Sequence, residues 1–487
     1  MAQICVTVTG RTMEEVRRAR DAAAADVVEV RLDGVEHPDP AAALEGRRCP
    51  VIVTCRPAWE GGKFDGSEEE RERLLLAAIH GGAEFVDVEL RAGFAADILR
   101  TRRGRGVIAS LHRFEPGPAD VAEELRALRS TGAQVVKLAV AVDSLAETLP
   151  LFELGARAEH DADPGQSHVL IAMGPRGAHT RVLAARLGNR WTYAGEAVAP
   201  GQMPASQLLE DFAFSRIRPD AELYGVVGSP IAHSLSPAMH NAGFAQAGLN
   251  AAYVALDARD ADDFVTFARA MKMRGASITA PFKVDLLEHA DACDALAQEV
   301  GAINTLVMQD GKWAGRNTDV HGLVEPLSDR IDLAGARVAV LGAGGAARAA
   351  VVGLKHAGAF VQVCARRADQ AAALATTLGV ASGSFPPVPG SWDVVVNTVP
   401  GVDGEQGSPM REVVIDGRIV FDLNYAPEVT PLIAQARAAG CETIGGIEML
   451  IRQAEKQFET WTGAPPPAGL FKSAADAARA RRAGVRS

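Results

Sequence analysis

The feature that most constrains the fold is a regular alternation of short β-rich runs and helical runs from residue 1 to about residue 218. Alternation of this kind joins parallel strands through crossover helices, so it predicts a parallel sheet covered by helices. The strand candidates are Ile4–Thr9, Val27–Arg31, Val51–Thr54, Phe85–Glu89, Val107–Leu111, Val135–Val140, Val169–Met173 and Trp191–Ala194. About eight repeats in this length predict a (β/α)8 barrel, with an open doubly wound sheet as the alternative.

Composition narrows the class of protein. The chain has 487 residues and a formal net charge of −11, which argues against nucleic acid or an anionic membrane as the main partner. Its six cysteines form no C-x-x-C pair or metal-ligand spacing, so we expect reduced thiols and no metal site. A strand candidate begins almost at once, at Gln3–Thr9, and no apolar run approaches the ~20 residues of a membrane helix. We therefore expect a cytoplasmic protein.

A second alternating region follows the polar, proline-containing segment Arg216–Pro219 and contains a glycine-rich turn. Residues 338–347 read Val-Ala-Val-Leu-Gly-Ala-Gly-Gly-Ala-Ala, between an apolar strand and an alanine-rich helix. This is the context that the G-x-G-x-x-G/A dinucleotide fingerprint requires, because backbone N–H groups at a helix N-terminus can receive a pyrophosphate. The cofactor-binding candidates in this turn are Gly342, Ala343, Gly344, Gly345, Ala346 and Ala347.

The choice of cofactor depends on the end of the next strand, Phe360–Cys364. An NAD site usually has an acidic side chain there for the ribose hydroxyls, whereas this chain has Arg366 and Arg367. Guanidinium groups suit a 2′-phosphate, so the sequence favours NADP(H). We expect a domain over 1–218 and a two-lobed α/β dehydrogenase over 219–487. Its substrate lobe would span about 219–325 plus C-terminal helices over about 447–487, and its NADP-binding Rossmann lobe about 326–446.

In the first domain, ionisable residues gather at the ends of the strand candidates, where (β/α)8 barrels build their active sites. They are Glu29, Arg31, Arg56, Glu60, His112 and Lys137. Lys137 lies inside an apolar strand candidate, where lost hydration favours the neutral amine, a nucleophile toward ketones. The alternative is a lysine whose stem packs while its amine reaches solvent.

These residues resemble the type I 3-dehydroquinate dehydratase family over roughly residues 3–215. The resemblance rests on Glu-x-Arg-x-Asp at 29–33, on the ionisable residues just named, on Arg181, and on the Ala199-Pro-Gly-Gln202 loop. It implies that Lys137 forms a Schiff base with the substrate ketone, that His112 moves protons, and that Glu60 orients His112. It also implies that Arg181 pairs the substrate carboxylate, and that Glu29, Arg31, Arg56 and Gln202 contact the substrate.

The second domain resembles the shikimate dehydrogenase family over nearly all of residues 222–470. The matching motifs are Tyr224–His240, Ile278–Lys283, Gly301–Thr305, Gly315–Asp319, Asp422–Pro427 and Met449–Gln453. The resemblance implies that Lys283 and Asp319 form the catalytic pair. It further implies substrate contacts from Ser234, Ser236, Thr279, Asn304, Tyr425 and Gln453, and cofactor contacts from Gly446 and Met449.

Two positions depart from these families. Val198 replaces the serine that commonly precedes the Ala-Pro-Gly-Gln loop, which would weaken substrate binding by about 0.5–1.5 kcal/mol, or up to ~3 if the lost bond met a charge. Ser277 replaces an asparagine two residues before the motif threonine Thr279, and its hydroxyl offers one donor and a shorter reach than an amide.

Together the resemblances imply a fused enzyme, in the domain order of the plant bifunctional proteins. It would convert 3-dehydroquinate to 3-dehydroshikimate and reduce that product with NADPH to shikimate. Three alternatives remain open: quinate as the dehydrogenase substrate, a barrel that only senses or scaffolds, and a Schiff-base aldolase. The oligomeric state is open. The Ala/Arg-rich segment that contains Arg481 and Arg482 is expected to be a solvated or frayed helix.

Overall fold

The computed structural model describes residues 2–117, 120–161, 165–195, 200–401, 407–411 and 413–484. The chain forms two compact units. Unit 1 contains residues 1–225, 229–273 and 477–487, and unit 2 contains residues 226–228 and 274–476. The strand β9 (Glu222–Gly228) is therefore divided between the units.

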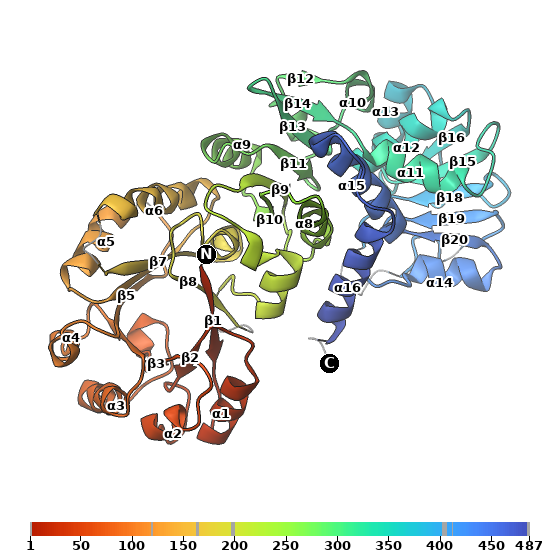
Figure 1. Ribbon diagram of the computed structural model, residues 1–487. Helices are drawn as coiled ribbons and strands as arrows, with labels where there is room; N and C mark the ends of the chain where they lie inside the picture. Colours follow the sequence, from red (N-terminus) through yellow and green to blue (C-terminus); the bar gives the residue numbers. More distant parts are fainter. Residues whose placement is uncertain are drawn as a thin grey trace. The chain divides into compact units, whose positions relative to one another are not determined.

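Unit 1 begins with an eight-stranded sheet in the order β7-β6-β5-β4-β3-β2-β1-β8, with every neighbouring pair parallel (Figure 1). The strands are β1 (Gln3–Val8), β2 (Val27–Arg31), β3 (Val51–Thr54), β4 (Phe85–Glu89), β5 (Val107–Arg113), β6 (Val135–Ala141), β7 (Ser167–Met173) and β8 (Trp191–Ala194). This is a nearly closed (β/α)8 barrel, as the sequence predicts, and the open-sheet alternative is wrong.

Between β7 and β8 the barrel is joined by a side chain. The amide of Asn189 donates to Leu170 O at 2.9 Å, and its Oδ1 accepts from Leu170 N at 2.8 Å. A backbone contact from Arg190 N to His168 O, at 3.0 Å, lies beside them. The buried amide thereby satisfies the strand groups that a ladder would otherwise pair.

The helices of the barrel begin where polar side chains cap them. Thr12, Ser67 and Asp120 each accept a hydrogen bond from the backbone N–H three residues ahead. The elements are α1 (Met13–Ala22), α2 (Pro40–Leu44), η1 (Ala58–Glu60), α3 (Glu68–His80), α4 (Ala95–Arg102), α5 (Val121–Ser130), η2 (Ala146–Thr148), α6 (Leu149–Asp161), η3 (Pro175–Gly177), α7 (His179–Val182), η4 (Gln207–Asp211) and η5 (Phe214–Arg216).

The barrel interior is layered. One apolar cluster contains residues that point inward from the strands, namely Cys5, Val27, Ile52, Phe85, Ile108, Val135, Val169 and Trp191. Two residues further along the strands, the side chains are mostly polar: Thr7, Glu29, Thr54, Asp87, Ser110, Lys137 and Tyr193. Because strand side chains alternate with a period of two, this second set also faces inward. The sequence therefore places a polar layer toward the carboxyl ends of the strands, where barrel enzymes carry out their chemistry.

Unit 1 also contains β10 (Ala251–Asp257), α8 (Ser236–Gln246) and α9 (Ala261–Ala270). The buried carboxylate of Asp263 in α9 accepts backbone N–H groups of Leu145 at 3.0 Å and Ala146 at 2.9 Å, which lie beyond β6. Phe267 packs edge-on against the ring of His179 at a centroid distance of 4.9 Å. The helix α9 is thus attached to the barrel by hydrogen bonds that Asp263 accepts and by the packing of Phe267.

Unit 2 contains two strand groups. The first is β11 (Gly275–Ile278), β13 (Thr305–Gln309), β14 (Lys312–Arg316) and β12 (Ala292–Cys293), in that order. The second is a parallel sheet in the order β17-β16-β15-β18-β19-β20. Its strands are β15 (Arg337–Leu341), β16 (Phe360–Cys364), β17 (Ala381–Gly383), β18 (Val394–Asn397), β19 (Ile419–Asp422) and β20 (Glu442–Gly445).

This second sheet has the 3-2-1-4-5-6 order of a dinucleotide-binding Rossmann fold, and it confirms the predicted βαβ unit. The helical elements of the region are η6 (Asp285–Leu287), α10 (Ala295–Val300), α11 (Asp319–Ser328), α12 (Gly345–His356), α13 (Ala368–Leu378), α14 (Pro431–Ala438), α15 (Gly446–Thr462) and α16 (Leu470–Gly484). Alanine and valine side chains of α12 pack against β15 and β16 in one apolar core. The strand order reverses between β15 and β18, the position at which such sheets bind nucleotides.

Candidate active sites

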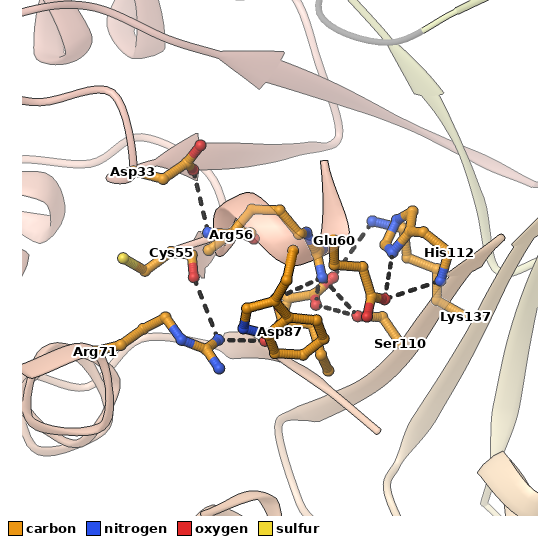
Figure 2. A network of polar contacts seen from close by, with 12 residues as sticks. Asp33, Cys55, Arg56, Glu60, Arg71, Asp87, Ser110, His112 and Lys137 are labelled. Carbon is orange, nitrogen blue, oxygen red and sulfur yellow. Dashed lines mark hydrogen bonds and ion pairs between the residues drawn. The ribbon is translucent and has the colours of Figure 1, made fainter. Parts of the chain in front are cut away.

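Lys137 projects from the middle of β6 into the polar layer of the barrel and is 5% exposed (Figure 2). Its Nζ donates to Asp87 Oδ2 at 3.3 Å, lies 3.8 Å from Glu29 Oε1, and stands 4.3 Å from the ring centre of Tyr193. Two carboxylates and an aromatic face therefore surround the buried amine. The sequence expectation of an amine that is simply desolvated is therefore incomplete, because the site supplies counter-charges.

His112 and Glu60 form a pair beside this lysine (Figure 2). Glu60 Oε1 accepts the backbone N–H of His112 at 2.8 Å and lies 3.0 Å from its Nδ1. Burial raises the pKa of Glu60 to about 7, and burial followed by the charges of Arg56 and Lys137 holds the pKa of His112 well below its usual value. The imidazole is thus neutral at neutral pH. With Nδ1–H directed at the carboxylate, Nε2 is left as a free base.

The pair lies next to a buried ionic network that the sequence analysis did not identify. Arg56 reaches Asp87 at 2.9 Å, Glu89 at 2.7 Å and the Ser110 hydroxyl at 2.8 Å. Glu89 in turn binds Arg71, whose side chain is fully buried. The sequence of β4 could have indicated this network. The strand carries two acidic residues, Asp87 and Glu89, at alternate positions, so both side chains lie on the inner face of the barrel.

Glu29 and Arg31 lie on β2 at the edge of the same layer. Glu29 accepts the hydroxyls of Thr7 and Thr54, each at 2.9 Å, so its carboxylate is held from both neighbouring strands. Arg31 makes a two-pronged contact with Asp33, at 2.7 and 2.8 Å. Asp33 also accepts backbone N–H groups, and its pKa is lowered by these partners despite its burial. This pair therefore orders the loop beyond β2.

Arg181 is buried in the short helix α7, between β7 and β8. Its guanidinium donates to the backbone oxygens of Ala172 at 3.1 Å and Pro200 at 3.2 Å, and burial lowers its pKa to about 10. No carboxylate pairs with it among the described residues, so its charge remains for an anionic ligand. Gln202 donates to the Thr7 hydroxyl at 3.3 Å. Val198 and Ala199 of the loop lie outside the described residues.

The dehydrogenase candidates of unit 2 converge on one carboxylate. Lys283 Nζ donates to Asp319 Oδ2 at 2.5 Å, and Asn304 Nδ2 donates to Asp319 Oδ1 at 2.7 Å. Asp319 is the first residue of α11, where the positive end of the helix dipole favours a carboxylate. Residues of three separate motifs are thereby brought together. The Lys283 side chain is 16% exposed, and Asn304 and Asp319 are buried.

The surroundings of this carboxylate come from α15 and β11. Asn304 Nδ2 also donates to Gln453 Oε1 at 3.3 Å. Ser277 donates to Gln457 Oε1 at 2.6 Å, and Gln457 donates to the Asn304 backbone oxygen at 3.0 Å. The departure at Ser277 therefore forms part of a buried bridge that holds Asn304. Thr279, just beyond β11, and Tyr425, beyond β19, are both half-buried.

The nucleotide turn follows β15 at the reversal point of the sheet. Gly342 has φ +114°, and a Cβ there would lie 2.4 Å from the Thr398 hydroxyl. Gly344 precedes α12 and makes no side-chain cap, and a Cβ on it would meet no atom within 4 Å. The open start of a 12-residue helix suits a pyrophosphate. Ala343 and Ala346 are half-buried and Ala347 is buried, all in the same turn and first helical residues.

Arginine side chains follow the neighbouring strand, as NADP binding needs. Arg366 and Arg367 lie beyond β16 and are exposed, and neither has an ion pair with a described residue. Gly446 begins α15 and packs so closely that a Cβ would meet the Leu423 backbone oxygen at 2.0 Å. Met449 belongs to the apolar core of the sheet. The residues present fit an NADP site at the turn and at the two arginines, while Gly446 and Met449 show structural packing.

The serine loop, defined as residues 229–235, belongs to unit 1 and leads into α8. Ser234 Oγ accepts the backbone N–H of Ser236 at 3.3 Å, which leaves the Ser234 hydroxyl proton for another acceptor. Ser236 is buried at the first position of α8, where the helix dipole favours an anion. The two hydroxyls therefore suit a carboxylate ligand.

Two findings bear on metals and membranes. Among the residues that the structure describes, no group of three or more His, Cys, Asp and Glu side chains is arranged to hold a metal ion. No helix in this part of the chain is both long and apolar enough to cross a bilayer.

These features define a class: a barrel with a buried lysine beside a histidine–carboxylate pair, joined in one chain to a Rossmann-type dehydrogenase. Family models agree with both halves. The type I 3-dehydroquinase model matches residues 4–219. The shikimate dehydrogenase substrate-binding domain matches 226–306, and the shikimate 5′-dehydrogenase C-terminal domain matches 446–475.

Relatives match one half or the whole chain. The bifunctional 3-dehydroquinate dehydratase/shikimate dehydrogenase, chloroplastic, of Arabidopsis thaliana is 32% identical, over 92% of this chain and 79% of that protein. The shikimate dehydrogenase (NADP(+)) of Methanocella arvoryzae is 40% identical, over 52% of this chain and 98% of that protein. A crystal structure of Aquifex aeolicus shikimate dehydrogenase has a TM-score of 0.50 at 32% identity, over 53% of this chain and 98% of that one.

A shikimate dehydrogenase crystallised with NADP+ has a TM-score of 0.51 at 31% identity, over 53% of this chain and 96% of that one. The chain therefore belongs to the family of bifunctional 3-dehydroquinate dehydratases/shikimate dehydrogenases.

Proposed function

We propose that this chain performs two successive reactions of the shikimate pathway. Residues 1–218 dehydrate 3-dehydroquinate to 3-dehydroshikimate, and residues 219–487 reduce that product to shikimate with NADPH. The observation that carries the proposal is the buried Lys137 with the Glu60–His112 pair beside it, in a chain whose second half holds Lys283 on Asp319. Neither an aldolase nor a binding module accounts for both halves.

In the dehydratase, Lys137 forms an imine with the C3 ketone of the substrate and one water is released. Asp87 and Glu29 stabilise the cationic iminium as they do the ammonium. His112 Nε2 then removes a C2 proton, and the electron pair moves toward the iminium nitrogen to give an enamine. Return of that pair expels the C1 hydroxyl, which leaves as water with the proton that His112 carries. Hydrolysis restores Lys137 and releases the enone.

Three groups support these steps by position and charge. Glu60 accepts the Nδ1 proton of His112 and stabilises the imidazolium that forms when His112 takes the C2 proton. Arg181, without a carboxylate partner among the described residues, is available for the substrate carboxylate. Arg56 neutralises Asp87 and Glu89 and so sets how much negative charge Lys137 meets.

In the dehydrogenase, Lys283 donates a proton to the ketone oxygen as it is reduced, and Asp319 holds the lysine in place. NADPH supplies the hydride when bound. Gly342, Gly344 and the start of α12 would hold its pyrophosphate, and Arg366 would hold its 2′-phosphate. A Cβ on Gly345 would lie 3.2 Å from Lys283 Cβ, so the lysine stem lies against the start of α12. Ser234 and Ser236 are proposed to bind the substrate carboxylate.

Location and domain limits stay predictions. The cytoplasmic location rests on the sequence pattern. The division at residue 218, with a substrate lobe over about 219–325 plus 447–487 and a cofactor lobe over about 326–446, rests on the motifs and the nucleotide-binding sheet.

A coupled assay of the full chain with 3-dehydroquinate and NADPH tests both reactions. We expect NADPH to be oxidised only after the ultraviolet absorbance of the conjugated enone begins to rise. Lys137→Ala should stop the reaction of 3-dehydroquinate and prevent borohydride trapping, yet still reduce added 3-dehydroshikimate. Lys283→Ala should accumulate the enone without oxidising NADPH. Substrate trapped on the Lys137→Ala protein would refute the Schiff-base assignment.

A further inference from the structure

Near the end of α16, two arginines contact a segment far away in the sequence. Arg482 Nη1 donates to His233 O at 2.5 Å, and its Nη2 donates to Ser234 O at 2.9 Å. Both carbonyl groups belong to the serine loop, and all of these residues lie in unit 1. The expectation of a solvated or frayed helix is therefore wrong for this part of the chain.

The two arginines are themselves held by an acidic anchor in η4. Arg482 Nη2 lies 3.3 Å from Asp211 Oδ2, while Arg481 binds Asp211 Oδ1 and lies 2.5 Å from Glu210 Oε2. The Asp211 side chain is 3% exposed, and its backbone oxygen accepts Asn241 Nδ2 of α8 at 3.1 Å. Since a buried carboxylate needs a counter-charge, the arginine positions are fixed by this anchor.

The contact bears on the residues that present Ser234. Ile231 and Leu235 are buried and anchor the two sides of the turn, whereas His233 is exposed. A planar guanidinium that binds two consecutive carbonyl oxygens fixes the orientation of the peptide between them. That peptide precedes the turn in which Ser234 Oγ accepts Ser236 N. Arg482 thus restricts the direction of the free Ser234 hydroxyl proton without contacting a ligand itself.

We infer that Arg482, set in place by Asp211, is a positioning residue for the carboxylate-binding serines of the dehydrogenase. The inference rests on the proposed role of Ser234 and Ser236. Its consequence is a specific one. Substrate binding depends on a side chain of the last described helix and on an acidic residue of the segment that follows the barrel, whereas NADPH binding and the dehydratase do not.

The test measures steady-state kinetics of shikimate oxidation in the full chain carrying Arg482→Ala. We expect KM for shikimate to rise about three- to tenfold, with kcat within about twofold and KM for NADP+ unchanged, because a pre-ordered binding loop has become mobile. Arg482→Lys should recover part of the loss, since an ammonium can hold one carbonyl but not the fork of two. Asp211→Asn should raise KM in the same direction. Lys472→Ala, which removes an exposed cation that pairs with Asp476 on the same helix, is the matched control.

Ser236→Ala separates the inference from the function on which it rests. If Ser236→Ala raises KM for shikimate and Arg482→Ala does not, the positioning role is wrong and the serine assignment stands. If Ser236→Ala leaves KM unchanged, the serine assignment fails, and the inference fails with it. A fall in kcat together with a higher KM for NADP+ would show general damage and would also overturn the inference. The dehydratase rate of each variant reports whether unit 1 remains folded.

Discussion

Glu60→Gln tests the proposed role of Glu60, which is to make the barrel histidine His112 a base. The amide keeps the shape of the side chain and removes the charge that meets the His112 N–H groups at 2.8 and 3.0 Å. A buried hydrogen bond to a charged group contributes about 1.5–3 kcal/mol. If that contribution is made mainly to the imidazolium of the transition state, kcat for dehydration should fall roughly ten- to hundredfold. Reduction of 3-dehydroshikimate by the same chain should be unchanged.

The pH dependence gives the sharper result. Burial raises the pKa of Glu60 to about 7, while burial, followed by the charges of Arg56 and Lys137, lowers the pKa of His112 well below its usual value, so Glu60 is the group of this pair that titrates near pH 7. The productive form has Glu60 ionised, so kcat/KM for 3-dehydroquinate should rise as pH increases through about 7. The amide of the Glu60→Gln variant cannot titrate, so this rise should disappear, leaving a lower and flatter profile between about pH 6 and 8.

The assay is enone absorbance against pH for the wild type, Glu60→Gln, and the surface control Glu36→Gln, whose partner Arg11 is exposed. An acidic limb near pH 7 that survives in Glu60→Gln would mean that another group titrates. A loss smaller than about threefold would mean that the contact orders the loop without contributing to proton transfer. Either result would refute the reasoning.

Three further changes have expected outcomes. Arg366→Ala should raise KM for NADPH about tenfold or more and leave KM for NADH nearly unchanged, since only NADPH carries the 2′-phosphate; equal losses would contradict this. Gly342→Ala should lower the free energy of unfolding, measured in urea, by about 1–3 kcal/mol. The backbone φ there is +114°, and the new Cβ would lie 2.4 Å from Thr398 Oγ1. An unshifted urea midpoint would argue against this strain. Asp263→Asn should lower the free energy of unfolding by about 1–3 kcal/mol. The substitution removes the charged acceptor of the backbone N–H groups of Leu145, Ala146 and Arg259. An unchanged melting temperature would show that these hydrogen bonds are dispensable.

The fold class could be predicted from the order of the amino acids alone, and the motif resemblances singled out the residues that we propose for catalysis. Strand–helix alternation has few solutions, and β2, β3, β4 and β8 begin and end where the pattern predicts. Lys137 could be singled out because a lysine inside an apolar strand is costly to bury without a function. The glycine turn and Arg366 could be recognised because their chemistry depends on residues close together in sequence.

The sharing of charge between distant groups became visible only in the folded chain. Asp87 and Glu89 were predicted as part of a strand, and their roles emerged when β3, β5 and β6 brought Arg56, Ser110 and Lys137 to them. The sequence around Arg482 likewise predicted only a solvated helix. Its contacts could not be foreseen, because the two carbonyl groups that it binds lie 248 and 249 residues away in the chain. The local sequence indicates the secondary-structure propensity of a segment and which of its side chains are buried. The counter-charges that set proton affinities and fix loops come from segments that are brought together by tertiary packing.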